Sequence, residues 1–358
     1  MSSKIAWARL HCQRLAAGRL ARPEDVVAWL GAVQAQEYHL AKWGLALRTR
    51  RATDVSVERA FAAGRILRTH AMRATWHFVT PADIRWLLAL TAPRVRAAVA
   101  FYDRQLGITP PVITRANRAI ARALAGGAQL TRTELKAVLA GAGVSVEGTQ
   151  RLAHVVMHAE LDAVICSGAR REKQFTYALL DDRAPASPVA SREEALAELV
   201  RRYFTSHGPA QLKDFVWWSG LTSADARIGL ESSRRHLAEE EIGGKRYWLA
   251  APDLRPGQPV RTAYLLQPYD EFLIAFKDRS ASLDPALGTS GAGRGPYAAP
   301  VVLDGRVVGG WRRSVARGRV TITVDIPERL AAADARLVQE AARRYGDFIG
   351  QSVTTVTV

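Results

Sequence analysis

The order of helices and strands predicted for the first hundred residues constrains the fold more than any other feature of this chain. Hydrophobic periodicity predicts helices at residues 4–17, 23–33 and 55–63, and residues 66–79 read as the two strands of a hairpin. Three helices followed by a two-stranded hairpin are the elements of a winged helix, in their usual order.

The same order of elements returns in the next stretch of the chain. Helices are predicted at residues 112–125, 130–140 and 148–166, and residues 172–179 suit a wing strand. The second of these helices opens with Thr-Arg-Thr-Glu, which is the pattern of a capping box.

A third copy follows a proline-containing linker at residues 185–188. Residues 192–206 and 222–236 read as helices, and residues 208–220 repeat the pattern of the short helix in the second copy. A glycine turn flanked by strand formers at residues 242–249 predicts another wing. Repeated helix-turn-helix spacing of this kind is typical of tandem winged helices.

The last hundred residues have a different pattern. Residues 264–276 are apolar and partly extended, and residues 281–296, rich in Gly, Ser and Ala, predict a mobile loop. A hairpin with an Asp-Gly turn at residues 301–308, a strand at 319–326 and an amphipathic helix at 329–349 follow.

These patterns together predict an α+β fold that is mainly helical. We expect winged-helix units at residues 1–108, 109–184 and 185–255. Residues 256–358 would form an α/β extension that packs on the winged helices.

Two glutamines follow the second predicted helix. Gln34 and Gln36 would share a face only if the chain leaves helical geometry near Val33 and becomes extended. Two amides facing one cleft can hold a water molecule or a sugar-phosphate backbone, but they cannot readily abstract a proton. The other interpretation is a pair of solvated or capping amides at a helix end.

The charge of the chain favours a polyanionic partner. The formal net charge is +16, and Arg greatly outnumbers Lys. A high-GC genome, rich in Arg and Ala codons, is the other explanation for the arginines.

Cysteine usage and hydropathy restrict the class further. Cys12 and Cys166 are too few for a disulfide framework or a zinc site. The N-terminus does not read as a signal peptide and no run of apolar residues reads as a membrane span, so we expect a soluble cytoplasmic protein.

The sequence resembles the AlkZ/YcaQ-type winged-helix DNA glycosylases over nearly its whole length. The family has a branch with Gln-x-Gln after the second helix and a branch with Gln-x-Asp, and this chain resembles the first, AlkZ-like branch. The matching segments, in the family's order, are Val33–Gln36, Thr69–Val79, Leu265–Phe272, Lys277–Arg279, Asp304–Arg306 and Trp311–Arg313.

The resemblance implies an activity and a shape. Three tandem winged helices would form a C-shaped arrangement around double-stranded DNA that contains alkylated purines, with Gln34 and Gln36 as catalytic residues in the cleft. The AlkZ-like branch is associated with bulky N7 adducts and with interstrand cross-links made by genotoxic natural products, hence with DNA repair and self-resistance. An open cleft with little or no base flipping is also implied.

The chemistry of such a lesion suits the two amides. N7-alkylguanine is cationic, so its glycosidic bond is already weakened, and a water held by Gln34 and Gln36 could attack the anomeric carbon. The motif has no lysine, so we expect a monofunctional glycosylase without a Schiff base. We expect no cofactor and no metal, and a monomer.

Other residues allow two readings each. His70 and Arg73 either contact the DNA backbone or the water, or they are an interior histidine and a structural arginine. Trp76 and His77 read as core residues, as do Trp217 and Trp218. We expect Asp270 and Glu271 to bind Arg or backbone groups rather than a metal. Candidate phosphate contacts are Lys277, Arg279, Arg306, Arg312 and Arg313.

Two other functions compete with the glycosylase. A non-catalytic winged-helix transcription regulator would also be basic, but it has no need of two cleft amides and would prefer an operator sequence. A drug-binding or sequestration protein would bind its ligand without DNA, and the net charge of +16 argues against it.

Overall fold

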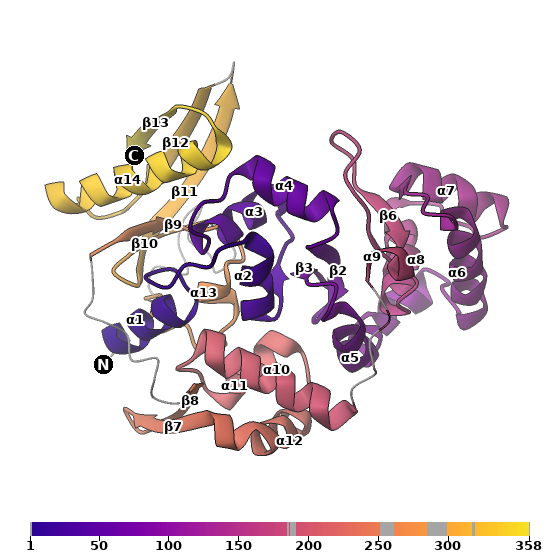
Figure 1. Cartoon of the computed structure of the whole chain (residues 1–358), viewed down its shortest axis with the longest axis horizontal. Coiled ribbons are helices and arrows are strands. Elements are labelled where there is room, and N and C mark those ends of the chain that lie inside the picture. Colours follow the sequence, from indigo (N-terminus) through magenta and orange to yellow (C-terminus); the bar gives the residue numbers. More distant parts are fainter. Residues whose placement is uncertain are drawn as a thin grey trace. The chain divides into compact units, whose positions relative to one another are not determined.

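The computed structural model describes residues 2–184, 186, 191–250, 261–284, 299–316 and 319–357. These residues form a mixture of helices and strands in which helical residues are the larger share, so the expected fold class is confirmed at this level (Figure 1). The chain divides into two compact units. Unit 1 comprises residues 1–58, 196–218 and 222–358, and unit 2 comprises residues 59–195 and 219–221.

The division into two units does not test the domain boundaries predicted from the sequence. The predicted linker at 185–188, the boundary at 255/256 and most of the loop at 281–296 lie outside the described residues. The winged-helix units at 1–108, 109–184 and 185–255 and the extension at 256–358 therefore stay predictions.

The first helices of unit 1 lead to the glutamine segment. They are α1 (Ser2–Cys12), α2 (Pro23–Leu30) and α3 (Tyr38–Leu47), with the short strand β1 (Val33–Gln34) between the last two. α2 buries Val26, Val27 and Leu30 on one face, as the periodicity predicts. It ends at Leu30 rather than at residue 33, because Gly31 takes the left-handed backbone with φ +83°.

A group of helices and a hairpin from the middle of the chain belongs for the most part to unit 1. These elements are α10 (Arg192–His207), α11 (Leu212–Ser219), α12 (Ser223–Ser233), β7 (Leu237–Ile242) and β8 (Lys245–Ala250). β7 and β8 pair antiparallel around Gly243 and Gly244, so the predicted glycine-turn hairpin is confirmed.

The C-terminal part of unit 1 is a five-stranded sheet with a long helix. The strand order is β13-β12-β11-β10-β9, antiparallel except for the parallel pair of β12 and β13. The elements are β9 (Ala263–Leu265), α13 (Glu271–Ile274), β10 (Pro300–Leu303), β11 (Arg306–Ala316), β12 (Arg319–Asp325), α14 (Ala332–Ile349) and β13 (Val353–Thr357). Within this sheet, β13 is a strand that the sequence patterns did not predict.

An aromatic cluster joins the two ends of the chain within unit 1. The ring of Tyr345 on α14 lies 5.3 Å from the rings of both Trp43 on α3 and Trp311 on β11, edge to face with Trp43. The indole N–H of Trp43 donates to the Leu265 carbonyl at 2.7 Å. The N-terminal helices therefore pack directly on the C-terminal sheet and helix.

Unit 2 begins with a hairpin and a long helix. β2 (Leu67–Ala71) and β3 (Thr75–Val79) pair antiparallel, which confirms the predicted hairpin, and α5 (Ile84–Gln105) follows. α4 (Asp54–Ala62) crosses the division between the units along the chain.

The rest of unit 2 is built on its own hydrophobic core. Its elements are α6 (Pro110–Leu124), β4 (Leu130–Thr131), α7 (Arg132–Gly141), α8 (Thr149–Leu161), β5 (Ile165–Ser167), β6 (Thr176–Leu179) and α9 (Leu180–Arg183). Ile120, Leu135 and Val155 from the three longer helices meet in this core. Thr131 and Glu134 form the predicted capping box at the start of α7. The order of helices and hairpin is the one expected, while the winged-helix arrangement stays a prediction.

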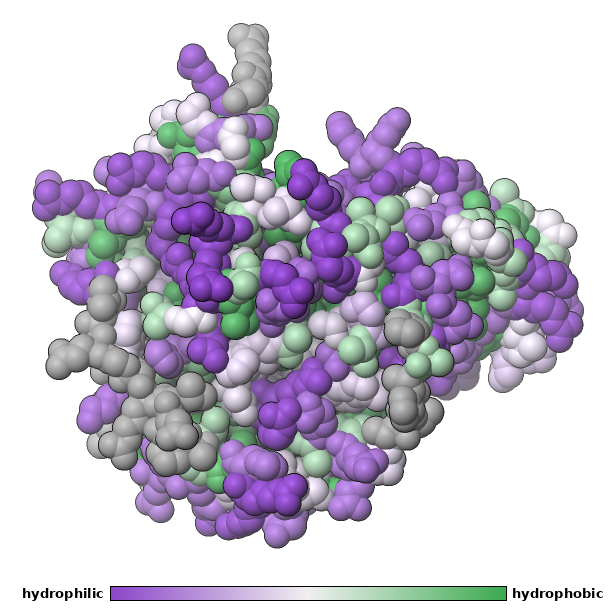
Figure 2. All heavy atoms as spheres, in the orientation of Figure 1, coloured by the Kyte–Doolittle hydropathy of each residue, from purple (hydrophilic) through white to green (hydrophobic). Residues whose placement is uncertain are grey.

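Polar residues cover most of the surface in view. Figure 2 shows hydrophilic residues over much of the displayed face, with hydrophobic ones scattered between them. The large apolar side chains lie mainly inside, and the two cysteines are buried and free.

Candidate functional site

The glutamine segment is not helical, as a joint role of Gln34 and Gln36 requires, and the preceding helix ends three residues earlier than expected. After Gly31, Val33 and Gln34 form β1, and α3 begins at Tyr38. Gln34 is buried, with 4% of its surface exposed, whereas Gln36 is exposed. The segment therefore offers one amide within the protein and one at its surface.

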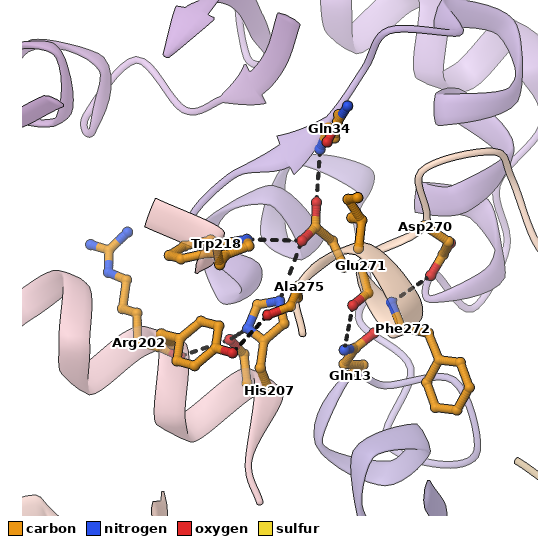
Figure 3. A network of polar contacts seen from close by, with 12 residues as sticks. Gln13, Gln34, Arg202, His207, Trp218, Asp270, Glu271, Phe272 and Ala275 are labelled. Carbon is orange, nitrogen blue, oxygen red and sulfur yellow. Dashed lines mark hydrogen bonds and ion pairs between the residues drawn. The ribbon is translucent and has the colours of Figure 1, made fainter. Parts of the chain in front are cut away.

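A buried carboxylate binds the main chain of Gln34. The Gln34 N–H donates to Glu271 Oε1 at 2.8 Å, and the other oxygen of Glu271 accepts the indole N–H of Trp218 at 2.9 Å (Figure 3). Glu271 is 1% exposed and lies in α13, 237 positions along the chain from Gln34. Figure 3 shows the end of the Gln34 side chain on the side away from Glu271.

A histidine faces the same carboxylate. Nε2 of His207, on α10, lies 3.6 Å from Glu271 Oε2. The Ser206 hydroxyl donates to the Arg202 carbonyl at 2.7 Å, and its oxygen lies 2.8 Å from Nδ1 of His207. Burial lowers the pKa of His207, and the Glu271 carboxylate opposes that shift.

A second carboxylate ties the neighbouring helices together. Arg48 donates to Asp270 at 2.7 and 3.1 Å and to the side-chain oxygen of Gln13 at 3.0 Å, and both members of the ion pair are buried. The Gln13 amide in turn donates to the Glu271 carbonyl at 3.1 Å. Asp270 and Glu271 thus bind an arginine, an indole and backbone N–H groups, which confirms the predicted structural role.

The described carboxylates are not arranged with other side chains that commonly bind metals so as to hold an ion. Among the described residues, no group of three or more His, Cys, Asp or Glu side chains is placed to hold a metal ion. The thiols are similarly unsuited, because burial raises the pKa of Cys12 to about 11 and that of Cys166 to about 12.

In unit 2, His70 is held by its own carboxylate. Its Nδ1 makes a short hydrogen bond with Glu160, which is fully buried on α8, and its ring lies 3.8 Å from that of Trp76. The guanidinium of Arg68 lies 4.0 Å above the same Trp76 ring. His70 therefore belongs to a packed group of rings and charges.

Arg73 lies in the turn of the hairpin and not in a strand. Met72, Arg73 and Ala74 all take left-handed backbone, with φ of 45°, 40° and 56°. In a continuous strand, His70 and Met72 would share one face and Arg73 would lie on the other, but the turn at residues 72–74 rules out that arrangement. The turn packs against Gly220, where an added Cβ would lie 3.3 Å from Arg73 Cγ.

The predicted core residues are largely inside. His77 and Trp218 are fully buried, which confirms that prediction, and Trp76 is half-buried against the core of unit 2. Trp217 is half-buried, and its indole N–H donates to the Ile274 carbonyl at 3.0 Å.

The five candidate phosphate contacts fall into two groups. Lys277, Arg306 and Arg312 are exposed. Arg279 is half-buried and donates to the Leu273 carbonyl at 2.9 Å, and Arg313 donates to the Tyr345 hydroxyl. The exposed three have side chains available to a partner, whereas the other two also bind within unit 1.

Sequence reasoning did not identify which groups hold Gln34 and His70. Glu271 and His207 are far from Gln34 in sequence, so no spacing pattern joins them. Glu160 carried a signal, because it is a carboxylate in the apolar run Val155–Leu161 of a helix. A buried acid in such a run needs a partner, and here the partner is His70.

Comparisons with known proteins match the chain to a protein family and to a relative of known structure. The family model described as "DNA glycosylase AlkZ-like" matches residues 27–348. The interstrand DNA cross-link repair glycosylase of Streptomyces sahachiroi is 28% identical over 322 residues, 86% of each chain. The solved structure of the Streptomyces sahachiroi DNA glycosylase AlkZ matches with a TM-score of 0.79 and 26% identity, covering 100% of this chain and 99% of that one.

Hydropathy adds one further finding. Among the described residues, every helix is too short or too polar to cross a membrane.

Proposed function

The chain belongs to the AlkZ-like DNA glycosylase family, hydrolases of N-glycosyl bonds in DNA repair, and from that premise we propose its substrate and mechanism. The proposed substrate is an N7-alkylated purine in double-stranded DNA. The proposed reaction is hydrolysis of its N-glycosidic bond by a water that Gln34 and Gln36 position.

The observation that carries the proposal is the conformation of the glutamine segment. Gly31 ends the helix, β1 extends the chain, and the main chain of Gln34 is fixed by a buried carboxylate. Held in this way, the buried Gln34 amide keeps a fixed place, and the exposed Gln36, two residues further on, would reach the same water from the surface side. Solvated amides at a helix end would need neither feature.

The reaction depends more on positioning the attacking water than on a general base that removes its proton. Alkylation at N7 places a positive charge on the purine, so the base leaves readily and the sugar acquires oxocarbenium character. An amide oxygen accepts a hydrogen bond from the attacking water and an amide N–H donates one, which orients the water toward the anomeric carbon. Such positioning contributes roughly several kcal/mol to lowering the barrier.

The substrate range extends to bulky lesions in this proposal. The similar Streptomyces protein is named an interstrand DNA cross-link repair glycosylase, and we propose that this chain also acts on bulky adducts and cross-links, in self-resistance to genotoxic natural products. Lys277, Arg306 and Arg312 would contact phosphates, because they are exposed. Arg279 and Arg313, which bind within unit 1, and His70 and Arg73 in unit 2 would support the DNA-facing surfaces. The chain would act as a monomer.

A strand-cleavage assay tests the proposal. A duplex carrying one N7-methylguanine is incubated with the protein, treated with alkali and compared with an undamaged duplex on a gel. The wild type should produce abasic sites only at the lesion, and the Q34A/Q36A variant should be slower by orders of magnitude with nearly unchanged duplex affinity. Q339A, which removes an exposed amide from α14, is the matched control and should behave as the wild type.

Two outcomes would contradict the proposal. Loss of DNA affinity in proportion to activity in Q34A/Q36A would make the glutamines binding residues. Failure of the wild type on N7-methylguanine, on a bulky N7 adduct and on a cross-link, together with preference for one undamaged sequence, would support the regulator.

A further inference from the structure

We infer that Glu271 is a positioning residue for the glutamine segment, acting through the main chain of Gln34. The inference rests on the proposed function, since it assigns to Glu271 the task of placing the amide that holds the water. Glu271 itself does not touch the substrate in this assignment.

The contacts of Glu271 converge on Gln34 from a rigid part of unit 1. Its carboxylate accepts the Gln34 N–H at 2.8 Å and the Trp218 indole N–H at 2.9 Å, and its own carbonyl accepts the Gln13 amide at 3.1 Å. Trp218 is fully buried on α11, and its ring lies close to those of Tyr203 and His207. The position of Gln34 is therefore tied to residues that cannot move easily.

The geometry requires two acceptor atoms that face two donors. Oε1 meets the Gln34 N–H and Oε2 meets the Trp218 N–H, so an ionised carboxylate satisfies both (Figure 3). A carboxamide offers a single acceptor oxygen and turns an NH₂ group toward the second donor. A buried donor left without an acceptor is destabilising, and here the loss would fall on the Gln34 main chain or on Trp218.

The hydrogen bond between Glu271 and the Gln34 main chain can affect the reaction because it leaves the Gln34 side chain directed elsewhere. The main-chain N–H of Gln34 points to Glu271, and the end of its side chain lies on the other side (Figure 3). Freeing the N–H lets the strand rotate or shift, and the amide that holds the water moves with it. A displacement of about 1 Å can lower a rate by about 100-fold.

The test compares three variants in single-turnover excision of N7-methylguanine. E271Q should lower the excision rate by roughly 10- to 100-fold while the duplex dissociation constant stays near that of the wild type. W218F alone is measured as well, so that the effect of E271Q can be compared with and without the Trp218 indole N–H. W218F/E271Q should excise faster than E271Q, because the NH₂ group then faces no N–H donor and the amide oxygen can accept the Gln34 N–H.

A matched control separates positioning from stability. Ser233 is buried near the end of α12, and its hydroxyl donates to the Gly229 carbonyl at 2.6 Å. S233A removes this hydrogen bond in a helix that makes none of the contacts to Glu271 described above, so it should lower the melting temperature and leave the excision rate unchanged. Amide hydrogen exchange adds a readout without substrate: Gln34 should exchange faster in E271Q than in the wild type and S233A.

The outcomes distinguish this inference from the proposed function. If the wild type excises, and E271Q excises as fast or W218F/E271Q is slower than E271Q, the positioning role is overturned while the glycosylase stands. If the wild type fails on every N7 lesion, the proposed function is overturned and the positioning role with it. Equal Gln34 exchange in the wild type and E271Q overturns the contact itself.

Discussion

Arg48 and Asp270 form an ion pair in which both side chains are almost completely buried, at 1% and 0% exposure. Replacing Asp270 by Asn would leave the Arg48 charge without its counter-charge, and breaking such a pair costs about 3–5 kcal/mol. We therefore expect D270N to lower the urea midpoint strongly. The measurement is equilibrium unfolding in urea, monitored by tryptophan fluorescence.

An exposed ion pair of unit 1 is the control for that prediction. Arg201 binds Glu198 at 2.8 Å, with side chains 40% and 33% exposed, so R201Q should change the free energy of unfolding by less than about 1 kcal/mol. Equal effects of D270N and R201Q would show that the burial of the first pair adds nothing to stability.

At the scale of single residues, the role of a side chain can be predicted from sequence when it depends on neighbours along the chain. The exit of Gln34 from helical geometry follows from the limits of the apolar stripe, and the structural role of Asp270 follows from the lack of a nearby metal ligand. The contact of Glu271 with Gln34 does not follow, because it depends on how α13 packs against β1. The surroundings of His70 depend in the same way on the packing of α8.

At the scale of elements, the start of α7 combines a cap with an acid. The Glu134 N–H donates to the Thr131 hydroxyl at 3.3 Å, and Glu134 accepts the Thr131 N–H at 2.7 Å. We expect T131A to destabilise unit 2 by about 1 kcal/mol, since an alanine cannot cap the helix. Urea unfolding of T131A measures the contribution of the cap. T133A is the control, because it removes an exposed threonine side chain two residues further on.

The same element predicts a dependence on pH. The Thr131 N–H, and then the Arg171 guanidinium, lower the pKa of Glu134 from 4.5 to about 2. A depressed carboxyl pKa stabilises the folded state above the unfolded value and loses this effect as the pH falls through the folded value. The stability difference between wild type and E134Q should therefore be full at pH 7 and shrink between about pH 4.5 and 2. A difference that grows toward pH 2 would contradict the sign.

The turn between β2 and β3 is a strained element. Ala74 is the third consecutive residue with left-handed backbone, a conformation that costs an L-residue about 1–2 kcal/mol. A74G should stabilise the protein by up to about 1 kcal/mol, after the larger entropy of glycine in the unfolded chain is subtracted. A74V should destabilise it, because a β-branched side chain fits that backbone poorly, and thermal melts of both variants check the opposite signs.

Turn and capping residues make an element easier to place from sequence. The Asp-Gly and Gly-Gly turns and the capping box identified the hairpins and the start of α7 from sequence. The left-handed turn at residues 72–74 contains no glycine, so turn chemistry gave no sign of it. β13 pairs parallel to β12. Two parallel strands are not joined by a short hairpin turn, so no turn sequence next to β13 indicates its pairing.

At the scale of the whole molecule, the net charge of +16 predicts a steep response of DNA binding to salt. The logarithm of the binding constant should fall linearly with the logarithm of salt concentration, with a slope of about −0.9 for each phosphate contacted. R306Q/R312Q should make the slope shallower by up to about 2. Fluorescence anisotropy of a labelled duplex between 50 and 200 mM salt, as a rough window, gives the slopes.

The control variant removes the same charge from arginines that already have partners. Arg171 binds Glu134 and Arg201 binds Glu198. R171Q/R201Q should leave the slope near that of the wild type. Equal slopes for the two double variants would mean that overall charge, and not these positions, sets the salt response.

The distance along the chain between Gln34 and Glu271 has a consequence during synthesis. The ribosome makes the glutamine segment early, but 237 residues separate Gln34 from the carboxylate that binds its main chain. At about 5–20 residues per second, roughly ten to fifty seconds pass between the two. Any nascent or prematurely ended chain shorter than 271 residues carries Gln34 without the carboxylate that binds its main chain. The segment that we propose to hold the water is therefore made early and gains this contact only late in synthesis.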